Sequence, residues 1–149
     1  MRICRKEGCL MRAQEFLKQL SKLNMLIENK LIEKQQWKSI AMGIGQRTDG
    51  ERVQSSGSQQ KMADAIARYV DIEKEIDAAI DKFVDTRIYI ISVIEKLPAV
   101  EYDLLHKVYV QGIELAEVAA ESGKSYSWAT STHGRALKTV QDILDSGKE

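Results

Sequence analysis

MADAIARYVDIEKEIDAAIDKFVDTRIYIISVIEKL, residues 62–97, is the stretch that decides the fold of this chain. Apolar residues recur in it at alternating spacings of four and three, the period of a helix packed along its length against another helix. The eleven stripe positions are Met62, Ile66, Tyr69, Glu73, Ile76, Ile80, Phe83, Arg87, Ile90, Ile94 and Leu97. All except Glu73 and Arg87 are apolar or aromatic. The pattern predicts one long helix, which Pro98 stops because its ring cannot continue the hydrogen-bond ladder.

The partner of this helix is expected at residues 13–41, where Leu17, Leu20, Ile27 and Leu31 repeat with helical spacing. Asn24 lies in the same stripe. A buried Asn there would fix register, but Leu23 and Leu26 widen the stripe and favour a place at its edge. Residues 43–60, rich in Gly, Ser and Gln, read as a loop. We therefore predict a long antiparallel two-helix hairpin, coiled-coil-like, formed within one chain or between two.

The totals suit a cytoplasmic protein of one or two small domains. The chain has 149 residues, 44% of them hydrophobic and 30% charged. No apolar run approaches the roughly 20 residues that cross a bilayer, so no membrane association is expected. Basic and acidic residues number 12 and 6 in residues 1–61, 5 and 8 in 62–97, and 5 and 8 in 98–149. The attraction between the first two segments favours the hairpin, and any binding of nucleic acid must come from locally placed charge.

Nothing in the sequence predicts an enzyme, a metal site or a cofactor. Cys4 and Cys9 lie in residues 1–10, which we expect to be a flexible tail, and the two histidines are isolated and far downstream. That is too few ligands for a zinc site. Paired carboxylates such as Asp81 and Asp85 have no His, Ser or Cys at a catalytic spacing and read as a solvated helix face.

The C-terminal domain, residues 98–149, has the pattern of a helix-turn-helix after the hairpin domain of residues 1–97. Ala119 supplies the small residue needed where two helices cross, Gly123 suits the tight turn, and Ser125 is a good N-cap for the final helix. Gly112 ends the helix that precedes this pair. The three features together make the motif more specific than a lone Ala-x-x-x-Gly.

The final helix is expected to read DNA with its exposed face. If Ala129, Thr132, Ala136, Leu137 and Val140 face the core, the residues between them face outward. Their short hydroxyls permit close approach to base edges and phosphates. Every charge between residues 122 and 141 is positive. The predicted DNA-binding residues are Lys124, Ser125, Tyr126, Ser127, Thr130, Ser131, Arg135 and Lys138. Trp128 is expected to pack rather than to stack on bases, His106 to be structural, and His133 to contact phosphate or to serve as an exposed or capping residue.

At this point the sequence resembles a known family. Residues 97–137, LPAVEYDLLHKVYVQGIELAEVAAESGKSYSWATSTHGRAL, resemble the promoter-reading C-terminal helix-turn-helix of bacterial sigma factors. Together with residues 51–77, ERVQSSGSQQKMADAIARYVDIEKEID, they are similar to the ArpU/RinA-type regulators of phages and prophages. Ala129 and Thr132 are smaller or more polar than the residues such helices usually bury there, so a rotated final helix is an open alternative.

The resemblance implies sequence-specific binding of double-stranded DNA and control of phage late genes in a bacterial host. Host RNA polymerase is a second candidate partner, contacted through the hairpin. Arg47 and Arg52 of the loop are candidates for a second contact, with DNA or with the polymerase. A homodimer is expected, since a single small module binds DNA weakly. Two alternatives remain open: a helical adaptor whose degenerate helix-turn-helix never touches DNA, and a phage DNA-packaging recognition subunit.

Overall fold

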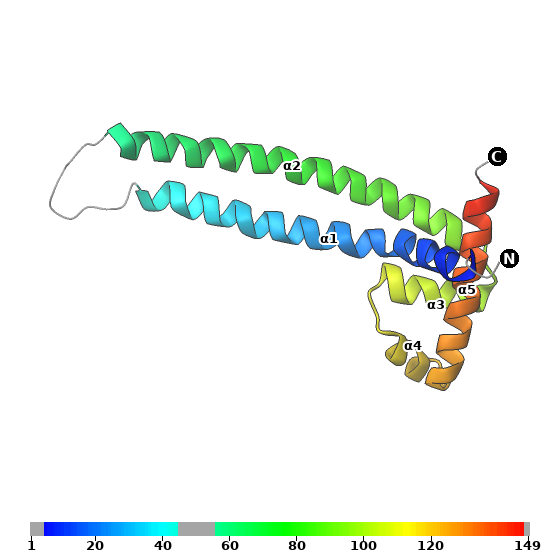
Figure 1. Ribbon diagram of the computed structural model, residues 1–149. Helices are drawn as coiled ribbons and strands as arrows, with labels where there is room; N and C mark the ends of the chain where they lie inside the picture. Colours follow the sequence, from blue (N-terminus) through cyan, green and yellow to red (C-terminus); the bar gives the residue numbers. More distant parts are fainter. Residues whose placement is uncertain (1–4, 45–55, 148–149) are drawn as a thin grey trace. The chain divides into compact units, whose positions relative to one another are not determined.

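The computed structural model describes residues 5–44 and 56–147, and these two ranges are built of helices without a strand (Figure 1). Two long helices, α1 (Arg5–Ile44) and α2 (Ser56–Ile94), are followed by α3 (Ala99–Leu105), a π-helical turn (His106–Val110), α4 (Leu115–Glu121) and α5 (Tyr126–Ser146). The predicted fold, a hairpin of two long helices followed by a C-terminal helical module, is confirmed.

Several bounds of the two long helices differ from those predicted. α1 begins at Arg5, so residues 5–10, expected in the tail, are helical, and α2 begins at Ser56 inside the expected loop. Cys4, Arg47 and Arg52 lie outside the described residues. The contacts expected of the loop therefore stay a prediction. α2 ends at Ile94 rather than Leu97. Pro98 has no N–H to donate to the Ile94 carbonyl four residues earlier, and it disfavours the helical conformation at Leu97, so the last residues form a tighter turn instead.

The chain divides into two compact units, and both long helices contribute to each. Residues 23–82 form one, here called the hairpin unit, and residues 1–22 together with 83–149 form the other, here called the terminal unit. These bounds differ from the predicted division at residue 97, since the ends of α1 and α2 nearest the C-terminal module belong to the same unit as that module. Each unit is described by itself below.

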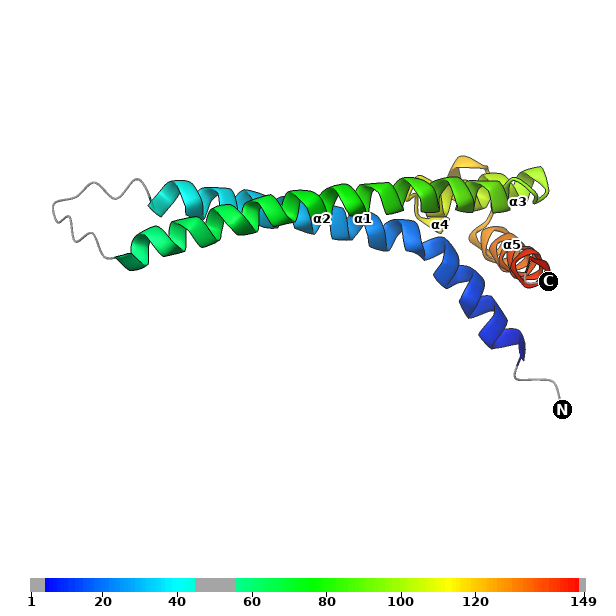
Figure 2. The same ribbon diagram turned by 90° about the horizontal axis from the view of Figure 1, so that it is seen from above.

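In the hairpin unit, α1 and α2 lie side by side in both views (Figures 1 and 2). The face of α2 turned to α1 is buried at Ala65, Ile72, Ile76 and Ala79. The predicted stripe shares only Ile76 with this set. The seam keeps the four-three alternation but uses the neighbouring set of positions.

Three apolar residues of the predicted stripe are consequently exposed, which corrects the prediction. Met62, Ile66 and Ile80 have exposed fractions of 36%, 49% and 42%. Glu73, one of the stripe's two charged exceptions, is exposed and accepts a hydrogen bond of 2.7 Å from Lys34. Burying a carboxylate costs far more than burying Ile72, so the charged residue marks the position where the helix must turn away from its partner.

On α1, the hairpin unit has no fully buried side chain among those described in residues 23–43. Leu31, predicted in the seam, is 49% exposed. Asn24 is exposed and its Nδ2 donates to Glu28 Oε1 at 2.8 Å, which confirms its place outside the buried stripe. Lys30 and Lys34 are half-buried there instead, with their aliphatic stems against α2 and their charges paired.

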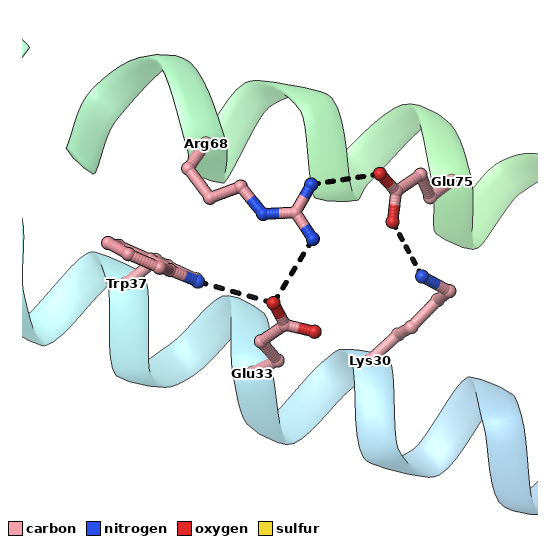
Figure 3. A network of polar contacts seen from close by, with 5 residues as sticks. All are labelled: Lys30, Glu33, Trp37, Arg68 and Glu75. Carbon is pink, nitrogen blue, oxygen red and sulfur yellow. Dashed lines mark hydrogen bonds and ion pairs between the residues drawn. The ribbon is translucent and has the colours of Figure 1, made fainter. Parts of the chain in front are cut away.

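A polar network joins the two helices of the hairpin unit along one flank (Figure 3). Arg68 donates to Glu75 Oε1 at 2.9 Å and to Glu33 Oε1 at 3.1 Å. Lys30 donates to the other oxygen of Glu75, and the indole of Trp37 donates to Glu33 at 3.3 Å. Lys30, followed by Arg68, lowers the pKa of Glu75. Such pairs add little stability at a solvated surface, but they specify which residues face each other.

The terminal unit contains the larger core. One continuous cluster joins the first part of α1, the last part of α2 and the C-terminal helices: Ala13, Leu17, Leu20, Ile90, Val93, Ile94, Leu97, Leu104, Leu105, Val118, Ala119, Ala129, Ala136, Leu137 and Val140. Leu17, Leu20, Ile90, Ile94 and Leu97 are buried as predicted. Arg87, the second charged exception of the predicted stripe, is exposed.

Candidate nucleic-acid interface

The turn between α4 and α5 has the geometry that its sequence predicts. Gly123 has a φ of +63°, which only glycine adopts without strain. Its N–H donates to the carbonyl of Ala120 at 3.1 Å, and the N–H of Lys124 donates to the carbonyl of Ala119 at 2.9 Å. This pair of bonds is the Schellman motif, which satisfies the last carbonyls of α4 and turns the chain sharply.

Ser125 caps α5 as predicted. Its Oγ accepts a hydrogen bond of 3.1 Å from the backbone N–H of Trp128, one of the four N–H groups that a helix start leaves without an intrahelical partner. The cap fixes the residue at which α5 begins. It therefore also fixes which of the following side chains turn inward.

The inward face of α5 is the predicted one. Ala129, Thr132, Ala136, Leu137 and Val140 are all buried, four of them with an exposed fraction of 0%. The helix is therefore not rotated, although two of these residues are small or polar. The Thr132 hydroxyl accepts a hydrogen bond of 3.3 Å from the Arg135 guanidinium.

The outward face of α5 brings the predicted DNA-binding residues together on one exposed surface, which we call the α5 face. It consists of Lys124, Ser125, Tyr126, Ser127, Thr130, Ser131, Arg135 and Lys138, and each of them is exposed. Thr130 donates its hydroxyl proton to the Ser127 carbonyl at 2.9 Å, and the Ser125 oxygen is used by the cap. The hydroxyls of Tyr126, Ser127 and Ser131 have no hydrogen-bond partner among the described residues, so they are free to bond a ligand.

One residue of the α5 face was not predicted. Gly134 is the ninth residue of the 21-residue α5. Helical spacing puts it on the same exposed face. Along the helix axis it follows the hydroxyl residues Ser127, Thr130 and Ser131 and precedes the cations Arg135 and Lys138. A Cβ placed on it would meet nothing within 4 Å. Packing inside the protein therefore gives no reason for a glycine, whose cost in a helix interior is about 1 kcal/mol relative to alanine. That unexplained cost is the signal in the sequence by which this position could have been found.

The aromatic residues behind the α5 face are structural. Trp128 is half-buried and packs on the core, as predicted. His133 is half-buried as well, its ring stacked on Tyr109 with centroids 5.8 Å apart and its Nε2 2.8 Å from the Tyr109 hydroxyl. Burial, followed by the charge of Lys18, lowers the pKa of His133. A neutral imidazole turned to Tyr109 does not suit phosphate, so neither role expected for His133 describes its environment.

Burial also raises the pKa of the Tyr109 hydroxyl, against a hydrogen bond from Gln14 that lowers it. The pair thus ties α5 to the π-helical turn and to the first part of α1 within the terminal unit. His106 lies on the other side of this turn, where Gln111 Nε2 is 2.9 Å from its Nδ1 and its ring is 5.7 Å from that of Tyr102. Its predicted structural role agrees with these contacts.

The charges of α4 limit the part of the motif that can approach a polyanion. Glu114, Glu117 and Glu121 are exposed, while Lys107 pairs with Asp103 at 3.1 Å and lies 3.9 Å from Glu121. Phosphates would be repelled by α4 and attracted by Lys124, Arg135 and Lys138. A polyanion would therefore approach the outward face of α5 and Lys124 before it, and not α4.

The described residues contain neither a metal-binding cluster nor a membrane-spanning helix. Among them, no group of three or more His, Cys, Asp or Glu side chains is arranged to hold a metal ion. No helix in the same residues is both long and apolar enough to cross a bilayer.

Comparison with known proteins gives no relative. No protein-family model, no curated protein and no solved structure matches the chain.

Proposed function

We propose that this chain is a sequence-specific double-stranded DNA-binding protein that regulates transcription of phage or prophage late genes, and that it is not an enzyme. The observation that carries the proposal is the α5 face: small hydroxyls and one glycine without side-chain bulk, flanked only by cations, at the start of the second helix of a helix-turn-helix. Recognition helices of such motifs enter the major groove by their N-terminal residues. The resemblance of the sequence to phage regulators and sigma factors supports the same function.

The residues have different roles in this proposal. Ser127, Thr130 and Ser131, with Tyr126, contact base edges and thymine methyl groups, while Lys124, Arg135 and Lys138 contact phosphates. Ser125 positions the helix through its cap. A dimer presents two such helices to two half-sites, which raises affinity without new contacts, and host RNA polymerase is the second proposed partner.

The first experiment is selection of bound sequences from random duplex DNA by the full chain. The proposal expects enrichment of one short motif, in single or two-fold repeated form. Absence of any enriched motif at 50 mM salt, where electrostatic binding is strongest, would contradict it.

Variants then assign the roles. Arg135→Ala should weaken binding to all sequences by roughly tenfold and reduce the slope of log K against log salt by about 0.9, the loss of one phosphate contact. Ser127→Ala and Ser131→Ala should change the preferred bases while leaving the salt slope unchanged. Lys74→Ala is the matched control, an exposed cation of the hairpin unit, and it should bind like the parent chain. Equal binding by all four variants would place the DNA contact elsewhere.

One observation favours a second candidate function, that of an adaptor that binds another protein and not DNA: the exposed acidic residues of α4. Mobility shift with phage promoter fragments and with packaging-site fragments separates the possibilities. Binding of promoter fragments supports the regulator, binding of packaging-site fragments alone supports a packaging subunit, and no binding of either supports the adaptor.

A further inference from the structure

The first part of α1 belongs to the terminal unit and lies against α5 (Figure 1). Ala13 and Leu17 are fully buried, in the core cluster that also contains Val140 of α5. Farther along α5, side chains of both helices line one cavity, among them Gln19 of α1 and Leu144 of α5. The helix that carries the α5 face therefore has α1 as a neighbour, although α1 lies outside the helix-turn-helix.

Lys18 lies on the side of α1 that is turned to the middle of α5. One turn before it, Gln14 bonds the Tyr109 hydroxyl, which is 2.8 Å from Nε2 of His133 on α5. At 100° per residue, Lys18 lies roughly 40° from Gln14 around α1, and its charge is close enough to His133 to lower the pKa of that imidazole. Lys18 is exposed, and no described carboxylate forms an ion pair with it.

His133 borders the α5 face at the edge formed by Thr130. At 100° per residue, His133 lies roughly 60° from Thr130 around the helix and roughly 160° from Arg135. The Arg135 guanidinium donates a hydrogen bond of 3.3 Å to the Thr132 hydroxyl, which directs it away from the Thr130 edge. That edge of the α5 face therefore has no cation from α5 itself, and Lys18 is the cation that α1 places beside it.

A helix in the major groove meets phosphates along both of its edges. The groove is about 12 Å wide and a helix with its side chains is about 10–12 Å across, so the two edges face the two strands. Arg135 can neutralise a phosphate of one strand. The hydroxyls at the Thr130 edge can bond a phosphate of the other strand but cannot neutralise it, whereas a lysine on a flexible stem can.

We propose that the DNA-binding surface extends from the α5 face onto α1, and that Lys18 binds a backbone phosphate of the strand opposite the one that Arg135 contacts. This inference rests on the proposed function, because it adds a contact to the same site. It makes α1 a part of the interface as well as a support for the core behind it.

The salt dependence of DNA binding by the full chain tests the charge contact. The probe is a duplex that carries the motif enriched in the selection, and fluorescence anisotropy follows binding between about 50 and 200 mM salt. Lys18→Ala should weaken binding roughly fivefold to tenfold near 0.1 M salt and reduce the slope of log K against log salt by about 0.9, the loss of one phosphate contact. Lys18→Arg keeps the charge and should keep the slope.

Lys96→Ala is the matched control for Lys18→Ala. It removes an exposed lysine of the same unit, one that lines the cavity beside Leu144 and so lies toward the other end of α5. Its salt slope should equal that of the parent chain. Circular dichroism checks that every variant keeps its helices.

Neutral methylphosphonates, placed at one backbone position of the duplex at a time, test the strand. A position where the substitution weakens binding by the parent but not by Lys18→Ala marks the phosphate that Lys18 contacts. The same comparison with Arg135→Ala should mark a phosphate of the other strand.

The outcomes separate this inference from the proposed function. An unchanged slope for Lys18→Ala beside a reduced slope for Arg135→Ala would overturn the contact with α1 and leave the proposed function standing. An equal reduction by Lys96→Ala, or two marked phosphates on one strand, would overturn the contact as well. A parent chain that binds no duplex would overturn both.

Discussion

Gly134 allows the stability of α5 and the binding by the α5 face to be measured separately. The residue is exposed in the middle of a 21-residue helix, and a Cβ there would meet nothing within 4 Å. Replacement by alanine can neither fill a cavity nor cause a clash. The remaining effect on stability is the difference in helix propensity between the two residues. Alanine is favoured over glycine in a helix interior by about 0.8–1.0 kcal/mol.

Gly134→Ala should therefore stabilise the chain by about 1 kcal/mol, which raises the melting temperature by roughly 3–6 °C. Gly134→Gln should stabilise it by about 0.5 kcal/mol, because glutamine is a good helix former that needs no packing. Both variants remove the glycine, and they differ in the length and polarity of the side chain that they place on the α5 face. Thermal and urea unfolding, followed by circular dichroism, measure the change.

DNA binding should respond to the same two variants in different ways. The alanine methyl is small enough for a groove-facing surface, so Gly134→Ala should bind within about threefold of the parent. Glutamine extends into the space that the proposal assigns to DNA, and Gly134→Gln should weaken binding at least tenfold despite its higher stability. Destabilisation by Gly134→Ala would refute the assignment of residue 134 to an open helix interior. Unchanged binding by Gly134→Gln would refute a DNA contact at this face.

Three further predictions concern the terminal unit. Ser125→Ala removes the cap of α5 and should lower the free energy of unfolding by about 1 kcal/mol, whereas Ser127→Ala, an exposed serine two residues on, should change it by less than about 0.5 kcal/mol. Leu105→Ala should cost about 2–5 kcal/mol in urea unfolding, because the side chain is fully buried and leaves a cavity; a cost below 1 kcal/mol would contradict its place in the core. Folding lowers the pKa of His133, so as the pH falls the unfolded chain binds a proton at this residue before the folded chain does. The contribution of neutral His133 to the free energy of unfolding should therefore be complete above pH 6.5 and be lost as the pH drops through the lower folded pKa. Unfolding curves between pH 7.5 and 5 should show this fall in the parent and less of it in His133→Gln, and equal slopes would show that other groups cause it.

The helices and the inward face of α5 could be predicted because local rules decide them. A four-three repeat, a proline, a glycine after a small residue and a serine cap each act over a few residues, and each marks a helix, a helix end or a turn that the structure contains. The choice of seam on α2 could not be read in this way. Two stripes on α2, the predicted one and the observed one, satisfy the same four-three spacing and have every second position in common. The stripe with fewer charged residues is the one that is buried against α1. Glu73 and Arg87 were the available signal that the chosen stripe was wrong.

The polar network of the hairpin unit (Figure 3) was beyond prediction for a different reason. Whether Arg68 meets Glu33, and whether Lys30 meets Glu75, depends on the axial register of the two antiparallel helices, which no local rule fixes. The His133–Tyr109 pair likewise joins residues whose meeting depends on how α5 crosses the π-helical turn. Gly134 differs from both, because its cost to an isolated helix can be estimated from the sequence alone.

The composition of the terminal unit has a consequence for the order in which the chain acquires its structure during synthesis. The residues that open the core, Ala13, Leu17 and Leu20, leave the ribosome first, and Leu137 and Val140, which belong to the same cluster, leave it about 120 residues later. At about 5–20 residues per second this interval is roughly 6–24 s. The hairpin unit has all its residues well before then. Its two helices can therefore pair early and hold the start of α1 close to α2, while the core that supports the α5 face closes last.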